Sequence, residues 1–305
     1  MTINKFFASQ RSYERLLLLF LLSLLLVAIL TACASEEESS PGEEEITETV
    51  SLTYVEWDSE IATTYVASAI LEDKMGYETE LIDVTLTALY ESVASGDQDG
   101  MLAAWLPKTQ GERYEPYRDD VVDLGPNLAG TTSGLVVPDY VPLETIEELL
   151  EYQEEFENKI IGIEPDAGIM DRTAEAMEAY DLEGDYDLVT GSDQTMTTTL
   201  KNALEEERWI VVTGWNPHWK FSKWNLNYLQ DPQNIYGEDE YIHTIVREGL
   251  EEDLPEVYQF LDNFKWEMED IEKVMSLIQI EEMPPEEAAR EWIENNKSLV
   301  ESWLP

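Results

Sequence analysis

The chain is poor in the residue types on which most covalent and metal chemistry depends. It has one cysteine, Cys33, and two histidines, His218 and His243, among 305 residues. A single cysteine excludes a disulfide within the chain. Histidines so far apart in the sequence make a poor metal site. We therefore expect no metal site and no cofactor.

Basic residues are scarce as well. The chain has 18 lysines and arginines against 66 aspartates and glutamates, which gives a formal net charge of −48. Nucleic acid and anionic lipid would repel such a surface, so we expect no nucleic-acid partner. A solvated acidic surface suits high salt, because at about 1 M salt the screening length falls to roughly 3 Å. We therefore expect lower stability in dilute buffer.

No apolar run of the sequence is long enough to cross a bilayer comfortably. The longest covers 16–30, is interrupted by one serine, and follows the basic residues Lys5, Arg11 and Arg15. Spanning a bilayer takes about 20 apolar residues, whereas a run of about 7–15 after a basic start is typical of a signal peptide. The pattern predicts a signal peptide over 1–32.

A short motif follows that run. Leu30-Thr31-Ala32-Cys33 resembles a bacterial lipobox, whose cysteine becomes lipidated and N-terminal, and an ordinary signal peptide with a chance cysteine is the alternative. We predict a lipidated Cys33 and an acidic, flexible stalk over 33–49, because its run of Glu, Ser, Pro and Gly has no apolar residue to bury. The predicted location is the extracytoplasmic face of the cell membrane, held there by lipid.

From residue 50 onward, short apolar runs alternate with amphipathic stretches, which is typical of an α/β fold. We predict strands at 51–56, 79–84, 100–104, 133–137, 159–163, 186–189 and 209–214. We predict helices at 59–74, 86–95, 143–156, 169–180, 193–206, 253–262, 268–280 and 285–303. This length favours two lobes: the first over 50–137 plus about 240–305, and the second over 138 to about 239, with the chain crossing between them near 134–138.

Three tryptophans stand at the exits of predicted strands: Trp57, Trp105 and Trp215. Strand exits of an α/β sheet form the crevice where ligands bind. Several indole rings facing one pocket attract cations that have no hydrogen to donate. These residues therefore predict recognition of a quaternary ammonium group, without chemistry on the ligand.

The other tryptophans have a different expected role. Trp209, Trp266, Trp292 and Trp303 lie within predicted elements and are expected in the core. We expect Trp219 and Trp224 to be structural, and a role at the pocket rim or the hinge is the alternative. His218 is expected to fix its loop. Asp58 or Ser59, Ser192 or Asp193, and Asp166 are candidate helix caps.

Several motifs together carry a resemblance to a known family. They are Trp57-Asp58-Ser59-Glu60-Ile61-Ala62, Ala104-Trp105-Leu106-Pro107, Ile161-Gly162-Ile163-Glu164-Pro165 with Gly168-Ile169-Met170, Thr213-Gly214-Trp215-Asn216-Pro217-His218-Trp219 and Ile242-His243-Thr244-Ile245. Over most of residues 50 to 300 the chain resembles the glycine betaine-binding proteins of ABC importers of the OpuA type.

The resemblance implies a fold and a function. The family fold is α/β, a two-lobed, periplasmic-binding-protein-like (type II) Venus flytrap with a mixed sheet in each lobe. The implied protein is no enzyme. It is an extracytoplasmic lipoprotein that captures glycine betaine or a related compatible solute for osmoprotection and serves ABC permease and ATPase subunits.

The resemblance also implies site residues. The family boxes the trimethylammonium group with three tryptophans, which fall here on Trp57, Trp105 and Trp215. It holds the ligand carboxylate with backbone amides, here of Gly168 and Ile169, and with a histidine after the Trp-Leu-Pro motif. This chain has Gln110 in place of that histidine. A glutamine amide donates a hydrogen bond but carries no charge at any pH.

Other functions remain open at this stage. A choline or carnitine ligand presents the same methylated cation, and tryptophan also stacks on sugars, so a sugar-binding lipoprotein is an alternative. An enzyme acting on a choline-like compound is disfavoured, because the chain has no nucleophile elbow and no Gly-rich phosphate loop. A non-binding adhesion or scaffold lipoprotein is disfavoured because exposed tryptophans would be a liability.

Overall fold

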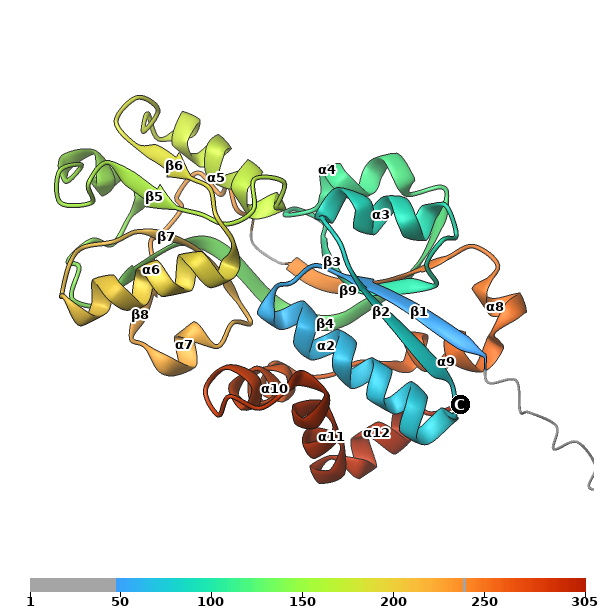
Figure 1. Ribbon diagram of the computed structural model, residues 1–305. Coiled ribbons are helices and arrows are strands. Elements are labelled where there is room, and N and C mark those ends of the chain that lie inside the picture. The colour runs from blue at the N-terminus through green and yellow to red at the C-terminus, as the bar shows by residue number, and fades with distance from the viewer. Residues whose placement is uncertain (1–47, 238–239) are drawn as a thin grey trace, which may run out of the picture. The chain divides into compact units, whose positions relative to one another are not determined.

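Mixed β-sheets organise the part of the chain that the computed structural model describes, residues 48–237 and 240–305 (Figure 1). The predicted signal peptide, Cys33 and almost all of the predicted stalk lie outside these residues. Within the described ranges, no helix has the length and apolar character needed to cross a membrane.

The first sheet contains the N-terminal strands and one late strand. Its strands are β1 (Thr49–Tyr54), β2 (Glu78–Asp83), β3 (Gly100–Leu106), β9 (Glu240–Arg247) and the first part of β4 (Val121–Pro138). Strand β1 pairs in parallel with β2 and β3, whereas β9 pairs antiparallel with β3 and β4. This sheet and its helices form lobe 1.

Helices lie on both sides of this sheet (Figure 1). Helix α3 (Leu86–Ala94) lies on one side of the sheet, and α2 (Asp58–Ile70) lies on the other. Helices α10 (Met268–Gln279) and α11 (Pro285–Asn295) pack against α2. The remaining helical segments of lobe 1 are a π-helical turn (Leu71–Met75), α4 (Gly111–Tyr114), a 3-10 turn (Glu115–Tyr117), α8 (Leu250–Asp253), α9 (Pro255–Asn263) and α12 (Lys297–Trp303).

The second sheet is the centre of lobe 2. Its strands are β5 (Lys159–Ile161), β6 (Asp187–Val189), β7 (Val212–Asn216), β8 (Leu226–Tyr228) and the last part of β4. Strand β5 pairs in parallel with β6 and β7, and β4 pairs antiparallel with β7 and β8. The helical segments of lobe 2 are a 3-10 segment (Ile146–Glu151), α5 (Gly168–Ala179), α6 (Asp193–Glu205) and α7 (Lys220–Lys223).

Strand β4 belongs to both sheets and carries the chain from one lobe to the other. Residues up to Thr131 pair with β9, and residues from Thr132 pair with β7. This change of partner comes just before 134–138, the segment predicted to cross. The chain returns between β8 and β9. The residue ranges predicted for the lobes stay a prediction.

Three strand segments were not predicted: the first part of β4, β8 and β9. The early part of β4 holds Gly125, Pro126 and Gly130, residues that disfavour strands, and its register with β9 shifts between Asp123 and Thr131. Glycine and proline within a strand are tolerated at such irregularities. The alternating pattern is therefore broken in sequence although the strand is continuous in space.

The predicted helix over 143–156 is wrong. The structure has only the 3-10 segment Ile146–Glu151 there, followed by turns with positive φ at Glu157 and Asn158. Six glutamates crowd 147–157. Like charges three or four residues apart repel on an α-helix, which opposes its propagation.

Side-chain caps were predicted with mixed success. Ser192 caps α6, because its Oγ accepts from the backbone N–H of Thr195 at 3.1 Å. Helix α2 begins after Trp57 without a side-chain cap, so capping by Asp58 or Ser59 is wrong. Asp166 is also not a cap, because α5 begins after Ala167.

The C-terminal tryptophans lie in the core, as predicted. Trp266, Trp292 and Trp303 are buried, and the rings of Trp292 and Trp303 stack with centroids 6.0 Å apart. Trp209 is half-buried, and its ring lies 5.4 Å from that of Phe156.

Candidate ligand-binding site

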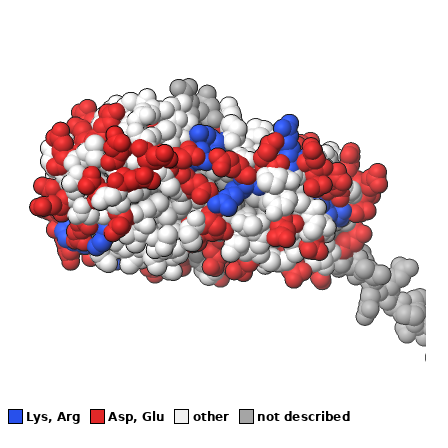
Figure 2. Space-filling view, turned by 90° about the horizontal axis from the view of Figure 1, so that it is seen from above, with Lys and Arg blue, Asp and Glu red and all other residues white. Residues whose placement is uncertain are grey.

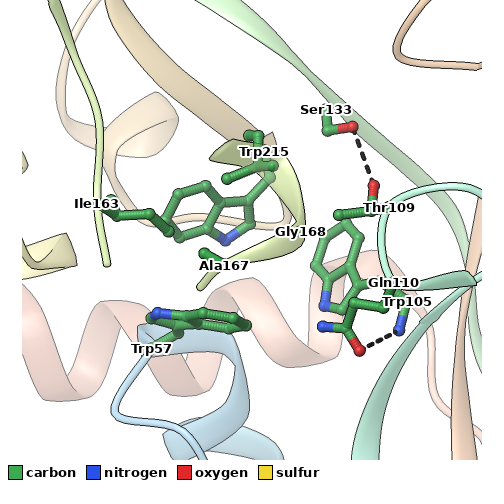
Figure 3. Close-up of a pocket in the computed structure, with 10 residues that line it drawn as sticks. Trp57, Trp105, Thr109, Gln110, Ser133, Ile163, Ala167, Gly168 and Trp215 are labelled. Carbon is green, nitrogen blue, oxygen red and sulfur yellow. Dashed lines mark hydrogen bonds between the residues drawn. The ribbon is translucent and has the colours of Figure 1, made fainter. Parts of the chain in front are cut away.

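A cavity lies between the two lobes, and aromatic and apolar side chains form most of its wall (Figure 3). Its lining residues are Trp57, Trp105, Thr109, Gln110, Ser133, Ile163, Ala167, Gly168, Ile169 and Trp215. All six residues predicted for the cage and for the carboxylate contact are among them. The structure thus brings together segments that are far apart in the sequence.

Trp57 follows β1 and immediately precedes α2. The buried carboxylate of Glu60 holds this turn, because its Oε2 accepts from the backbone N–H of Val55 at 2.8 Å. Burial raises the pKa of Glu60 well above its usual range. The Trp57 indole N–H donates to Glu164 Oε2 of lobe 2 at 2.9 Å. Trp57 is therefore fixed by its own lobe and bonded to the opposite one.

Trp105 and Trp215 lie near the ends of strands, one in each lobe. Trp105 is on β3 and Trp215 is on β7, and both are almost fully buried. Figure 3 shows the ring of Trp215 above that of Trp57, with Trp105 beside the space between them. Aromatic rings with this arrangement present π-electron density to whatever occupies the cavity.

The N-terminus of α5 forms another part of the wall. Gly168 and Ile169 are the first two residues of this helix. The first N–H groups of a helix have no acceptor within it, and they favour a negative charge. A side chain at position 168 would not fit, because a Cβ there would lie 2.1 Å from the backbone oxygen of Thr109 in lobe 1. Glycine is therefore required for the lobes to come this close.

Gln110 is buried, and its amide has a defined orientation. Its Oε1 accepts from the Tyr90 hydroxyl at 2.8 Å and from the backbone N–H of Trp105 at 3.2 Å. Because two donors occupy the oxygen, the amide nitrogen is left to donate to a ligand. Figure 3 shows this nitrogen turned away from the backbone nitrogen that binds the oxygen.

Two polar residues of the wall were not predicted, Thr109 and Ser133. Their hydroxyl oxygens lie 3.3 Å apart, and Thr109 also donates to Glu240 Oε2 at 2.6 Å. Burial raises the pKa of Glu240. Thr109 lies two residues after the Trp-Leu-Pro motif and directly before Gln110, so it could have been found from that motif. Ser133 faces Trp215 across the β4–β7 pairing, a relation that only the register reveals.

Ion pairs join the lobes beside the cavity. Arg113 and Asp171 lie 2.7 Å apart, and Arg172 and Glu112 lie 2.9 Å apart, with α4 of lobe 1 supplying one partner of each pair. With the Trp57–Glu164 bond, these contacts define a closed arrangement of the lobes around the cavity.

A second group of polar side chains lies behind the cage. This group, the Asp58 cluster, consists of Asp58 from lobe 1 and Asp193, His218, Trp219 and Lys220 from lobe 2. His218 lies 3.0 Å from Asp193 and 3.7 Å from Asp58. The Trp219 indole donates to Asp58. The buried Lys220 Nζ makes no hydrogen bond to any residue that the structure describes and lies 4.2 Å from the centre of the Trp215 ring.

Burial shifts every titratable group of the Asp58 cluster toward its neutral form. It raises the pKa of Asp58 and of Asp193 to about 6, and it lowers the pKa of Lys220 to about 7. It also lowers the pKa of His218 well below its usual range. The ligand atoms of Asp58, Asp193 and His218 lie within 4.8 Å of one another, as in a metal site. The Lys220 ammonium nearby attracts both carboxylates and supplies positive charge to the cluster.

The expected role of His218 in fixing its loop is confirmed. Its Nδ1 accepts from the backbone N–H of Lys220 at 3.1 Å, so the proton of the neutral ring is on Nε2, which faces Asp193. Its ring packs against Trp215 with centroids 4.9 Å apart. His243 is remote from this loop and bonds to Asp123.

Two lobes with mixed sheets, joined by a shared strand and closed on an aromatic cavity, define a substrate-binding protein of the two-lobed type II class. The chain belongs to the family described as the substrate binding domain of ABC-type glycine betaine transport system, whose model matches residues 48–295. This is a family of transporter substrate-binding domains and not of enzymes.

Known relatives agree with this assignment. The chain is 49% identical over 151 residues to the glycine betaine/carnitine transport binding protein GbuC of Listeria monocytogenes serotype 1/2a (strain 10403S), which is 49% of this chain and 50% of that protein. The match thus spans half the length of that relative.

Solved structures match over a longer stretch. Lactococcal OpuAC in its closed-liganded conformation, complexed with glycine betaine, is 39% identical with a TM-score of 0.81, covering 85% of this chain and 100% of that one. An ABC-transporter choline binding protein in complex with choline is 30% identical with a TM-score of 0.78, covering 84% of this chain and 91% of that one.

Proposed function

We propose that this chain is the extracytoplasmic substrate-binding lipoprotein of an ABC importer and that it captures glycine betaine, or a close relative of it, for osmoprotection. The observation that carries the proposal is the composition of one cavity wall. Trp57, Trp105 and Trp215 lie on it together with the free N–H groups that begin α5.

The three indoles suit the cationic end of a betaine. A trimethylammonium group has a diffuse charge and no N–H donor, so a carboxylate partner gains little from it by hydrogen bonding. Each aromatic face contributes about 0.5–2 kcal/mol by cation–π attraction, and more when the site is dry. Ammonium and sodium ions keep their water and are disfavoured in such a cage.

The donors of the wall suit a carboxylate. The backbone N–H groups of Gly168 and Ile169 and the amide of Gln110 form the candidate contact for it. Choline has a single hydroxyl at that end, so it would leave some of these buried donors unpaired, which costs about 1–3 kcal/mol per group. This favours a carboxylate-bearing ligand over choline.

A sugar is the alternative ligand of a different class. Sugars need many side-chain donors and acceptors around the ring. Of the ten lining residues, only Thr109, Gln110 and Ser133 have polar side chains other than indole, and each of the three is engaged in hydrogen bonds with the protein. The wall therefore favours the methylated cation.

Partners and location follow from the family. We propose that ABC permease and ATPase subunits receive the ligand and that lipidated Cys33 anchors the chain. Cys33→Ala should release the protein from the membrane fraction of cells. Retention there would contradict the lipid anchor.

Binding is tested by titration with a ligand series. The full chain is titrated with glycine betaine, carnitine, choline and glucose, and tryptophan fluorescence is recorded. We expect a response to glycine betaine at concentrations where choline and glucose give little. A response to glucose, with none to any methylated ammonium compound, would overturn the proposal.

A further inference from the structure

Asp58 connects the two lobes directly behind the cage. Its Oδ1 accepts from Gln279 Nε2 of lobe 1 at 2.6 Å, while its Oδ2 accepts from the Trp219 indole of lobe 2. His218 Nε2 lies 3.7 Å from the same carboxylate. The backbone N–H of Asp58 lies 3.5 Å from Asp193 Oδ2. One residue of lobe 1 thus meets three residues of lobe 2.

The lobe 2 side of this contact is built independently of Asp58. His218 is fixed by Asp193 and by the backbone of Lys220, and its ring packs against that of Trp219 with centroids 5.7 Å apart. Asp58 therefore docks onto a surface of lobe 2 whose residues hold one another in place without Asp58.

The same residues support the cage. Asp58 directly follows Trp57 in the chain. His218 packs against Trp215, and Lys220 Nζ lies over the Trp215 ring. When Asp58 docks, it brings the loop of Trp57 to a fixed place relative to the support of Trp215. Docking of Asp58 and assembly of the cage are thus geometrically linked.

The contact also contains a repulsive element. Asp58 and Asp193 are both carboxylates and lie close together in a buried place, which opposes docking. The repulsion offsets part of the attraction in the docked contact. A partial offset of this kind suits a lobe closure that must be reversible.

We propose that Asp58 is a positioning residue of the ligand site, which fastens the closed lobes through Trp219, His218 and Asp193 and thereby holds Trp57 opposite Trp215. The proposal rests on the proposed function for its ligand. It concerns which residue stabilises the closed form, and Asp58 itself does not line the ligand cavity.

The test uses Trp219→Phe, which keeps an aromatic ring and removes the N–H that donates to Asp58. Asp58→Ala is the second variant. Trp224→Phe is the matched control, since Trp224 packs on Trp219 at 5.2 Å between ring centroids but makes no hydrogen bond to lobe 1 in the described chain. Two quantities are measured: the affinity for glycine betaine, and the exchange rate of the Trp57 indole hydrogen in the ligand-free protein by NMR.

We expect both variants to bind glycine betaine about tenfold more weakly, the size of effect for one lost hydrogen bond. We also expect the Trp57 indole hydrogen to exchange faster. Its acceptor, Glu164, makes no hydrogen bond to Trp219 within the described ranges, so faster exchange in Trp219→Phe reports loosening of the lobes. Trp224→Phe should behave as the wild type in both measurements.

Unchanged affinity and unchanged exchange at Trp57 in Trp219→Phe would overturn the role of Asp58. If the wild type bound no methylated ammonium compound, the proposed function would fail, and the exchange rate would still decide the role of Asp58. If Asp58→Ala failed to fold, Trp219→Phe would carry the test alone.

Discussion

Individual residues of the cavity differ in how much their chemistry could be predicted. Trp57, Trp105 and Trp215 were predicted because three indoles at separate strand exits, each in a family motif, indicate one cage, although a single tryptophan there more often packs in the core. Ser133 was not predicted, since a serine in a strand has no pattern of its own and reaches the cavity only through its register with Trp215. Asp58 was predicted only as a helix cap. Its contacts with lobe 2 could not be predicted, because the sequence does not show that α6 and the His218 loop lie against it.

Gln110 gives the sharpest test at the carboxylate end. In Gln110→His the ring would add a positive charge when protonated, whereas glutamine has none. If position 110 contacts the carboxylate, the gain in affinity for glycine betaine from pH 8 to pH 5.5 should be larger in this variant than in the wild type, by about tenfold. Choline, which has no carboxylate, is the control ligand, and its gain should be the same in the variant and in the wild type. An equal response of both ligands would mean that position 110 does not contact the carboxylate.

Asp58 predicts a pH dependence of binding in the wild type. In the closed form its pKa is raised to about 6, first by burial and then by Asp193, while His218, Trp219 and Lys220 lower it. In an open form the carboxyl meets water and has its usual lower pKa. Closure of the lobes therefore takes up a proton on Asp58. This proton stabilises the closed form at low pH, and the stabilisation is lost as pH rises through about 6.

Other titratable groups near Asp58 do not reverse this sign. His218 is enclosed by Trp215 and Trp219, and Lys220 by Trp215 and Phe221, all of their own lobe, so closure changes their burial little. Glu56 and Glu164 line, together with Asp58, a second cleft outside the ligand cavity. Their negative charge favours the protonated form of Asp58.

We expect glycine betaine to bind about tenfold more tightly at pH 5 than at pH 8, because pH 5 lies about one unit below the pKa of Asp58 in the closed form and pH 8 lies above it. Asp58→Asn should flatten the profile. Calorimetric titrations at both pH values measure it, with circular dichroism to verify folding. Tighter binding at pH 8 than at pH 5 would contradict the account.

At the scale of elements, the strands and helices of the α/β pattern were mostly predicted, and the misses have two causes. Strand β4 bridges both sheets with glycines and a proline at its irregularities, and its pairing is long-range, which a local pattern does not contain. The segment 143–156 has helical periodicity, but its like charges three or four residues apart oppose an α-helix.

Helix α5 provides the test at this scale. Gly168→Ala would place a Cβ against the backbone of Thr109, and backbone cannot yield as a side chain can. We expect at least tenfold weaker binding of glycine betaine with little loss of thermal stability, because the clash arises only between closed lobes. Gly111→Ala is the matched control, since a Cβ there meets open space. Similar affinity in both variants would mean that closure does not require glycine at 168.

At the scale of the whole molecule, acidic charge dominates. Figure 2 shows acidic side chains spread over the visible face with few basic ones among them, as expected for a net charge of −48. The composition predicts this surface, because charged residues that alternate with apolar ones on helices face water. The composition does not predict which of the few basic residues join the lobes. The structure places Arg113 and Arg172 there.

Salt should therefore stabilise the folded chain. Screening at about 1 M salt confines repulsion to roughly 3 Å, so the melting temperature should rise from dilute buffer to molar salt. Scanning calorimetry in sodium chloride measures it, and an equal concentration of sucrose controls for general solute effects. A melting temperature that stays constant would contradict the interpretation of the acidic surface.

The central claim is that three indoles from two lobes hold a methylated cation. Its most direct test is calorimetric titration of glycine betaine into the wild type and into Trp57→Ala, Trp105→Ala and Trp215→Ala, with Trp209→Ala as a control far from the cavity. The account predicts that each cage variant loses about 1–3 kcal/mol of binding free energy, while the control binds as the wild type does. Wild-type affinity in all three cage variants would contradict it.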